Sequence, residues 1–162
     1  MEAIKHDANN DIYRGQLFLF LGELPLAFAS TCSLEVTAEE VDVSNKMMGD
    51  WAASLPGKKS FTISSEALLS RKEGQMSYDT LLEKLIAGET LGFFFGEAKA
   101  TEQTNTGGKF EKDTEKVNYT GTVMITSLSL KSDNGQIASC SVSLKGIGAL
   151  TPVAPVAPPP AN

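Results

Sequence analysis

The sequence predicts a mainly β domain, a β-sandwich or barrel-like fold, with one flanking α-helix. Several segments alternate apolar and polar residues with the two-residue period of strands, and one segment has a helical period. The 162 residues suffice for one domain with a hydrophobic core, and 41% hydrophobic with 21% charged residues is ordinary for a globular protein. The 14 basic and 20 acidic residues give a net charge of −6, which argues against tight binding to nucleic acid through its phosphates.

The first part of the chain predicts two strands after a polar arm. Residues 1–14 are mostly polar and are expected to be mobile until something binds them. Residues 16–21 are apolar at odd and even positions, as in a strand that is covered on both faces. From 26 to 38 the even positions are mainly apolar, so this longer strand should have one exposed face. At Glu39 and Glu40 the apolar positions change from even to odd, which predicts a β-bulge or a bend.

Residues 44–57 predict an irregular loop with more large apolar side chains than an exposed loop needs. Either this loop folds onto its own domain or another molecule covers it. The side chains concerned are Met47, Met48, Trp51, Leu55 and Pro56.

The middle of the chain predicts a strand, a helix and another strand. Strand character resumes over residues 59–69 and again over 91–97. Between them Ser77 is placed to cap a helix that Gly88 ends. One face of this helix is apolar and should pack on the sheet; it carries Tyr78, Leu81, Leu82, Leu85 and Ile86. Residues 98–118 then form a polar connection, too long for an idle loop, that we expect to be mobile or ordered by assembly.

Residues 119–150 predict a β-hairpin whose register follows from the apolar positions. A two-residue turn at Asn134 and Gly135 would put the apolar faces of the two arms on opposite sides, so the pattern rejects it. A three-residue loop with left-handed Gly135 places them on one side. It pairs Leu130 with Ala138, Leu128 with Cys140, Thr126 with Val142 and Met124 with Leu144. Val123 and Ile125 then fall on the other face, which should also be covered.

The chain therefore divides into a mobile arm, a β domain and a tail. The arm is residues 1–14, the β domain is residues 15–150, and residues 151–162 hold five of the seven prolines. A segment of this composition is expected to be extended and unpacked.

Enzymatic and metal-binding chemistry find no support in the residues. The only histidine, His6, lies in the arm, so a nucleophilic or acid–base site lacks its usual base. Cys32 and Cys140 occupy apolar positions of alternating strands and predict buried free thiols rather than metal ligands. We expect no catalytic, cofactor or metal site. The apolar run 17–21 is too short to insert in a membrane.

Four places in the chain, taken in order and with their spacing, carry a family resemblance. They are residues 39–44 with 49–51 and 55–57; 59–64; 81–88 with 93–96; and 119–121 with 125–130 and 141–148. Together these segments resemble the major tail tube proteins of long-tailed bacteriophages, over residues 16–150.

The resemblance implies a virion structural protein that assembles as stacked hexameric rings around a channel for DNA ejection. Its partners would be copies of itself, the tape measure protein, tail terminator and initiator proteins, and genomic DNA in passage. Its place would be the virion tail, after assembly in the host cytoplasm. The loop and the arm become candidate contacts between subunits or rings, through Met47, Met48, Asp50, Trp51, Leu55, Pro56, Ile12 and Tyr13.

Two alternatives remain at this point. The inner tube of a contractile tail, a tailocin, a gene transfer agent or a secretion system shares the same fold family. A monomeric β-barrel that binds a small ligand is a different class, which the apolar strands would also allow. A monomer should bury the loop cluster internally.

Overall fold

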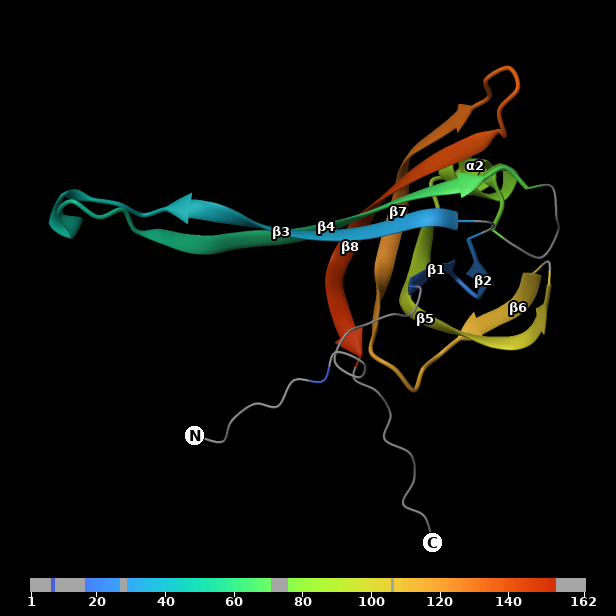
Figure 1. Ribbon diagram of the computed structural model, residues 1–162. Coiled ribbons are helices and arrows are strands. Elements are labelled where there is room, and N and C mark those ends of the chain that lie inside the picture. Colours follow the sequence, from blue (N-terminus) through green and yellow to red (C-terminus); the bar gives the residue numbers. More distant parts are fainter. Residues whose placement is uncertain (1–6, 8–16, 27–28, 71–75, 106, 154–162) are drawn as a thin grey trace, which may run out of the picture.

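The computed structural model describes Asp7 and residues 17–26, 29–70, 76–105 and 107–153, and this part of the chain is mainly β with one α-helix (Figure 1). The predicted fold class is confirmed. In chain order the elements are β1 (Leu17–Leu21), β2 (Leu24–Pro25), β3 (Ala29–Asp42), the 3-10 turn η1 (Lys46–Met48), β4 (Ser54–Leu68), α2 (Tyr78–Ala87), β5 (Thr90–Thr104), β6 (Gly107–Lys112), β7 (Asn118–Lys131) and β8 (Ser139–Val153).

One antiparallel sheet makes up most of the domain. Its strands follow the order β2-β1-β5-β7-β8-β4-β3, and β6 pairs with β5. The sheet curls so that its two ends approach each other, and the thiol of Cys32 on β3 forms a hydrogen bond with the backbone of Leu19 on β1. The curled sheet and the helix enclose the core. We call the side of the sheet that carries Phe61 and Val142 the core face, and the opposite side the open face.

Strand β1 is covered on both faces, as predicted. Leu19 and Leu21 enter the main core. Phe20 points the other way and is 1% exposed. Its ring meets that of Phe94 edge-on, with the centroids 5.7 Å apart.

Residues 98–118 are not the irregular connection that the sequence predicted. Strand β5 continues to Thr104 and turns back as β6, and this hairpin folds over β1, where the ring of Phe110 stacks on that of Phe18 at 5.1 Å. The Lys112 ammonium donates to the carbonyl of Gly22 at 2.8 Å, beside the rings of Phe20 and Phe94. The prediction failed because this hairpin buries little, so its residues lack the alternation of a strand with one buried face.

The predicted helix is confirmed, although its apolar face is only partly buried. Gly88 adopts the left-handed conformation, φ 69°, and its N–H bonds the carbonyl of Leu85. Leu81 is fully buried in the core and Leu85 packs against it. Ile86, predicted to lie on the packed face, is 78% exposed.

The β7–β8 hairpin has a different register from the predicted one. Leu128 pairs with Val142 and Leu130 with Cys140, because the loop is longer than three residues, although Gly135 is left-handed as expected. A bulge between Ile125 and Ser127 then reverses the sides of the first arm. Val123 and Ile125 are buried in the core, whereas Met124, predicted to face it, is 42% exposed.

The residues expected in the core of this hairpin divide accordingly. Cys140, Val142 and Leu144 are buried and Leu128 packs against the core, but Leu130 is 51% exposed, contrary to the prediction. Strand β8 also extends to Val153, so residues 151–153 are not part of a loose tail. The rest of the tail, 154–162, and all of the arm 1–14 except Asp7 lie outside the described residues.

Gly146 provides a test of the core packing. A Cβ added there would overlap the buried ring of Phe61, and overpacking of this kind costs about 1–3 kcal/mol. We expect Gly146→Ala to lower the free energy of unfolding by that amount, measured as a lower urea midpoint at constant m-value.

Gly92→Ala is the matched control, because a Cβ at this strand glycine meets no atom within 4 Å. Its effect should stay within about 0.5 kcal/mol. Equal losses in the two variants would contradict the packing described for Phe61.

Candidate assembly surface

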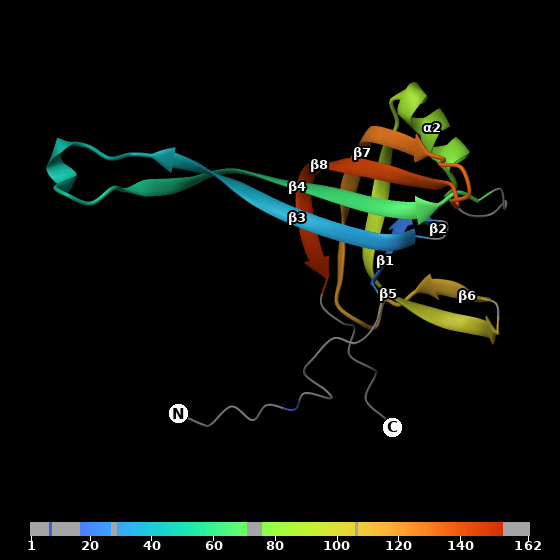
Figure 2. The same cartoon turned by 45° about the horizontal axis from the view of Figure 1, so that its top comes forward.

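Strands β3 and β4 form a long arm that projects from the body of the domain (Figures 1 and 2). The two strands pair from Ala29 with Ala67 to Asp42 with Ser54. The other strands of the core end well before the arm does, so its outer half has no layer beneath it. The arm ends in a turn made of residues 43–53.

The turn at the end of the arm is held by its own hydrogen bonds. Asn45 begins the 3-10 turn and accepts from the N–H of Met47 at 2.9 Å. Ser44 bonds across to Ala53, whose N–H donates to the Ser44 hydroxyl at 3.0 Å. Hydrogen bonds from the Ser44 hydroxyl and N–H hold the pKa of Asp42 below its usual value. The tip is therefore a defined local fold that does not depend on contacts with the body.

This fold presents the large apolar side chains to solvent. Met47 is 94% exposed and Trp51 84%, and Leu55 and Met48 are also exposed. Asp50 and Pro56 are exposed as well. Of the two arrangements that the sequence allowed, the described structure has the loop away from its own domain. Ile12 and Tyr13, the other expected contact residues, lie outside the described residues.

Both sides of the arm carry exposed apolar residues. The register shifts between Ala38 and Glu40, where the sequence predicted a bulge or a bend, but the extra residue is in β4, between Pro56 and Lys59. Strand β3 therefore keeps its alternation, so Val36 lies on the core side, whereas Val41, opposite Leu55, lies on the same side as Thr37 and the open face. Val36, Val41 and Val43 are all exposed. We did not predict these three valines as contact residues, because their alternation is the same as that of a strand that covers a core.

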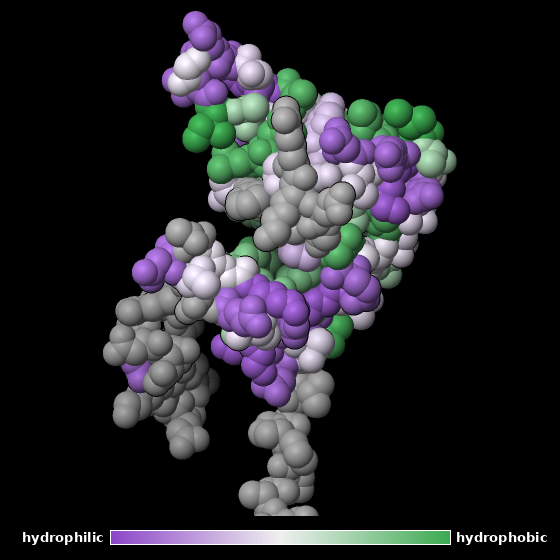
Figure 3. Space-filling model, turned by 90° about the vertical axis from the view of Figure 1, so that its right-hand side faces the viewer, coloured by the Kyte–Doolittle hydropathy of each residue, from purple (hydrophilic) through white to green (hydrophobic). Residues whose placement is uncertain are grey.

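A second group of exposed apolar residues lies at the end of the sheet opposite the arm. The N–H of Leu69 bonds the carbonyl of Ala138, which brings the end of β4 against the β7–β8 loop. Figure 3 shows this end of the molecule; its upper half has hydrophobic residues among hydrophilic ones, and its lower half is mainly hydrophilic. We call the group the distal patch; it consists of Leu68, Leu69, Leu130 and Ile137.

Two strand edges have no partner among the described residues. Strand β3 pairs only with β4, so its outer edge is free. Strand β5 pairs with β7 only from Asn118 to Met124, so the outer edge of β7 from Ile125 to Lys131 is free too. Free edges of this length invite pairing with another chain. Sequence alone did not reveal them, since pairing between distant strands decides which edges remain.

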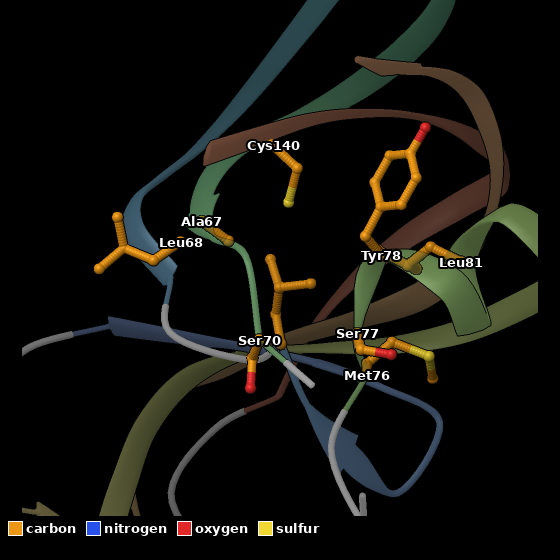
Figure 4. Close-up of a pocket in the computed structure, with 9 residues that line it drawn as sticks. Ala67, Leu68, Ser70, Met76, Ser77, Tyr78, Leu81 and Cys140 are labelled. Carbon is orange, nitrogen blue, oxygen red and sulfur yellow. The ribbon is translucent and has the colours of Figure 1, made fainter. Parts of the chain in front are cut away.

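The rest of the described structure offers little to a ligand. A hollow at the start of α2, lined by Leu26, Leu68, Met76, Leu81 and Cys140 among others, has a volume of about 10 Å³ (Figure 4), room for at most one water. The described residues contain no cluster of His, Cys, Asp and Glu that could hold a metal. Burial raises the pKa of the Cys32 and Cys140 thiols, which disfavours the reactive thiolate form.

The family model for phage tail tube proteins matches residues 24–152, most of the chain. The chain belongs to this family. No curated protein sequence matches it.

Solved tail tubes and related tubes share the fold of this family member. A protein from the tail of an empty gene transfer agent particle, resolved with C6 symmetry, has a TM-score of 0.63 at 21% identity, over 85% of this chain and 96% of the other. The SPP1 tail tube protein has a TM-score of 0.61 at 13% identity, over 90% of this chain and 81% of the other. A chain of the sheath–tube complex of an extracellular contractile injection system has a TM-score of 0.58 at 13% identity, over 90% of this chain and 93% of the other. No described helix of the tail tube protein has the length and apolar character needed to cross a membrane.

The single tryptophan makes the tip of the arm directly measurable. Trp51 is the only tryptophan, so its fluorescence in the isolated subunit should be that of a water-exposed indole and should be quenched by iodide. Trp51→Ala should change the free energy of unfolding by no more than about 0.5 kcal/mol. Leu81→Ala, a buried control, should lose about 2–5 kcal/mol. A protected Trp51 in a monomer would contradict the exposed tip.

Proposed function

We propose that this tail tube protein polymerises as stacked hexameric rings and so forms a channel through which DNA leaves the particle. The observation that carries the proposal is the arm, whose tip holds Met47 and Trp51 almost fully in solvent on a fold of its own. A monomer gains nothing from such exposure, whereas a second copy that covers the tip buries it.

The two free edges support closure of a ring. Strands β7, β8, β4 and β3 alternate in direction, since each pair is antiparallel. In a copy related by rotation, β7 therefore runs antiparallel to β3 of its neighbour. Pairing of the β3 edge with the edge from Ile125 to Lys131 would continue the sheet from copy to copy and leave no edge free. Sixfold closure is proposed from the C6 symmetry of the gene transfer agent tail.

The two apolar ends of the subunit support stacking of the rings. Successive rings in a tube meet head to tail, so one end of each subunit contacts the opposite end of another. The tip lies at one end of β4 and the distal patch, with Leu68, at the other. We propose that the tip of one ring packs on the distal patch of the next. Burial of Met47 and Trp51 together would contribute about 3–6 kcal/mol per contact before entropy.

The remaining assignments follow from this role. The protein would be a structural component of the particle's tail and not an enzyme. It would meet tape measure, terminator and initiator proteins during assembly in the host cytoplasm. Ile12 and Tyr13, in the N-terminal segment 1–14, remain proposed contacts between rings. The fold is similar to that of both a gene transfer agent tail and a contractile injection tube, so the kind of particle is left open within this class.

Electron microscopy of the concentrated protein tests polymerisation. We expect rings or tubes, formed either spontaneously or after addition of an initiator. Trp51→Ala should leave rings but shorten or abolish tubes, because it removes the largest side chain of the tip.

Ile86→Ala is the matched control. Ile86 is an apolar side chain with similar exposure, 78%, but it lies on α2, outside the tip and the distal patch. Tubes of normal length from Trp51→Ala would refute the stacking contact. A species that stays monomeric at every concentration, with initiator present, would refute the proposed function.

Deletion of residues 155–162 tests the role of the proline-rich end. Strand β8 ends at Val153, so the truncated chain keeps the whole sheet. We expect its tubes to match those of the full chain in length and its unfolding midpoint to be unchanged. Loss of tubes would show that this end takes part in assembly.

A further inference from the structure

Hydroxyl side chains predominate on the open face of β7, β8, β4 and β3, which also carries the apolar residues Leu68, Met124 and Ile147. One row crosses all four strands and consists only of serines, since Ser127 pairs with Ser143, Ser143 with Ser64 and Ser64 with Ser33. The other hydroxyl residues of this face are Thr31, Thr37, Ser60, Thr62, Ser129, Ser139 and Ser141. All of these side chains are exposed or half-buried.

The charges on this face cancel. Over the body of the domain, before the arm begins, its carboxylates are Glu35 and Glu66, and its ammonium groups are Lys131 and Lys145. The formal charge of this part of the face is therefore zero, although the chain as a whole carries −6. An acidic composition does not give this protein an acidic open face.

The hydroxyl groups also bond one another. Ser33 and Ser64 are 2.6 Å apart at their Oγ atoms, and Thr37 and Ser60 are 3.0 Å apart. Ser30 and Thr126 bond carbonyls of neighbouring strands. Hydroxyls engaged in this way have less capacity left to bind a passing phosphate, and their short side chains leave the surface smooth.

Closure of the sheet into a ring decides where this face lies. The core face carries a second layer made of α2, β1 and β5, whose side chains fill the core with Phe61 and Ile63. When a sheet closes on itself, the face with the bulkier layer must be the outer one, because the inner circumference is smaller. The open face then lines the bore.

We infer that the bore of the tube is a neutral hydroxyl lining, over which duplex DNA passes because the wall neither attracts nor repels its phosphates. Binding of DNA to a protein wall is driven by release of counterions from phosphates that Lys or Arg neutralise. A net-neutral face of serines and threonines releases few, so DNA is not held. This inference rests on the proposed function and adds the chemistry of the channel wall.

The first experiment locates the face in assembled tubes. Ser64→Cys places a thiol on the open face, and its labelling is compared with that of the wild type, whose two thiols are half-buried (Cys32) and buried (Cys140). Thr114→Cys, in the exposed turn between β6 and β7, is the control. In tubes, a small maleimide should label both variants, and a maleimide coupled to a large polymer should label only Thr114→Cys.

The second experiment tests neutrality. Wild-type tubes should retain no short duplex DNA at about 50 mM salt, whereas tubes of Ser64→Lys should retain it and lose about 10³-fold or more in affinity by about 200 mM. Thr114→Lys adds the same charge away from the open face and should not retain DNA inside the tube. Ser129→Lys replaces Ser64→Lys if the latter fails to assemble.

The outcomes separate this inference from the proposed function. If tubes form but Ser64→Cys reacts with the large reagent along their length, the open face is outside and the inference is wrong. It is also wrong if neither reagent labels Ser64→Cys, because another molecule then covers the face, or if wild-type tubes hold DNA at low salt. If no tubes form at all, the proposed function fails and the inference fails with it.

Discussion

Strands β3 and β4 are longer than the core that covers them, and the rest of the arrangement follows from this mismatch. Over the body, alternate residues such as Phe61 and Ile63 are buried. Beyond the body, past the bulge in β4, Val41 and Leu55 lie opposite each other and are exposed. The arm has no second layer there, so its apolar side chains stay in solvent on the isolated subunit. A partner is the usual way in which such surface is buried.

The elements with strong local signals could be predicted from the sequence. The helix has a residue that ends it, Gly88, and the change of parity at Glu39 and Glu40 coincides with a register shift between β3 and β4, although the extra residue is in β4. The β7–β8 register could not be predicted, because Met124 and Ile125 are adjacent apolar residues and a bulge decides which one faces the core. The β5–β6 hairpin could not be predicted, because it buries little apart from Phe110 and its sequence therefore lacks the alternation of a strand with one buried face.

The candidate assembly surface could be predicted only where the local composition was unusual. Met47, Met48 and Trp51 stand out in a loop otherwise rich in polar residues, so their unusual position could be seen without a structure. The free edges of β3 and β7 could not be inferred, because they depend on where β5 begins to pair with β7. The charge of the open face could not be predicted either, because the total charge of −6 does not show which charged residues share a face. The strand register decides this, and the register predicted for β7 was wrong.

Acidic residues lie next to the exposed apolar residues of the β3–β4 arm, where they can disfavour incorrect contacts. Glu39, Glu40 and Asp42 lie on the arm, beside the exposed valines. Residues 39–59 also contain Lys46, Lys58 and Lys59, so their net charge is only −1 and repulsion between whole arms is weak. The carboxylates act instead at the β3 edge, where charged side chains oppose unwanted strand pairing. In the proposed tube, the tip would pack on Leu68, Leu69 and Ile137, which carry no charge. Apolar burial would then stabilise the correct contact, while the carboxylates raise the free energy of incorrect strand pairing.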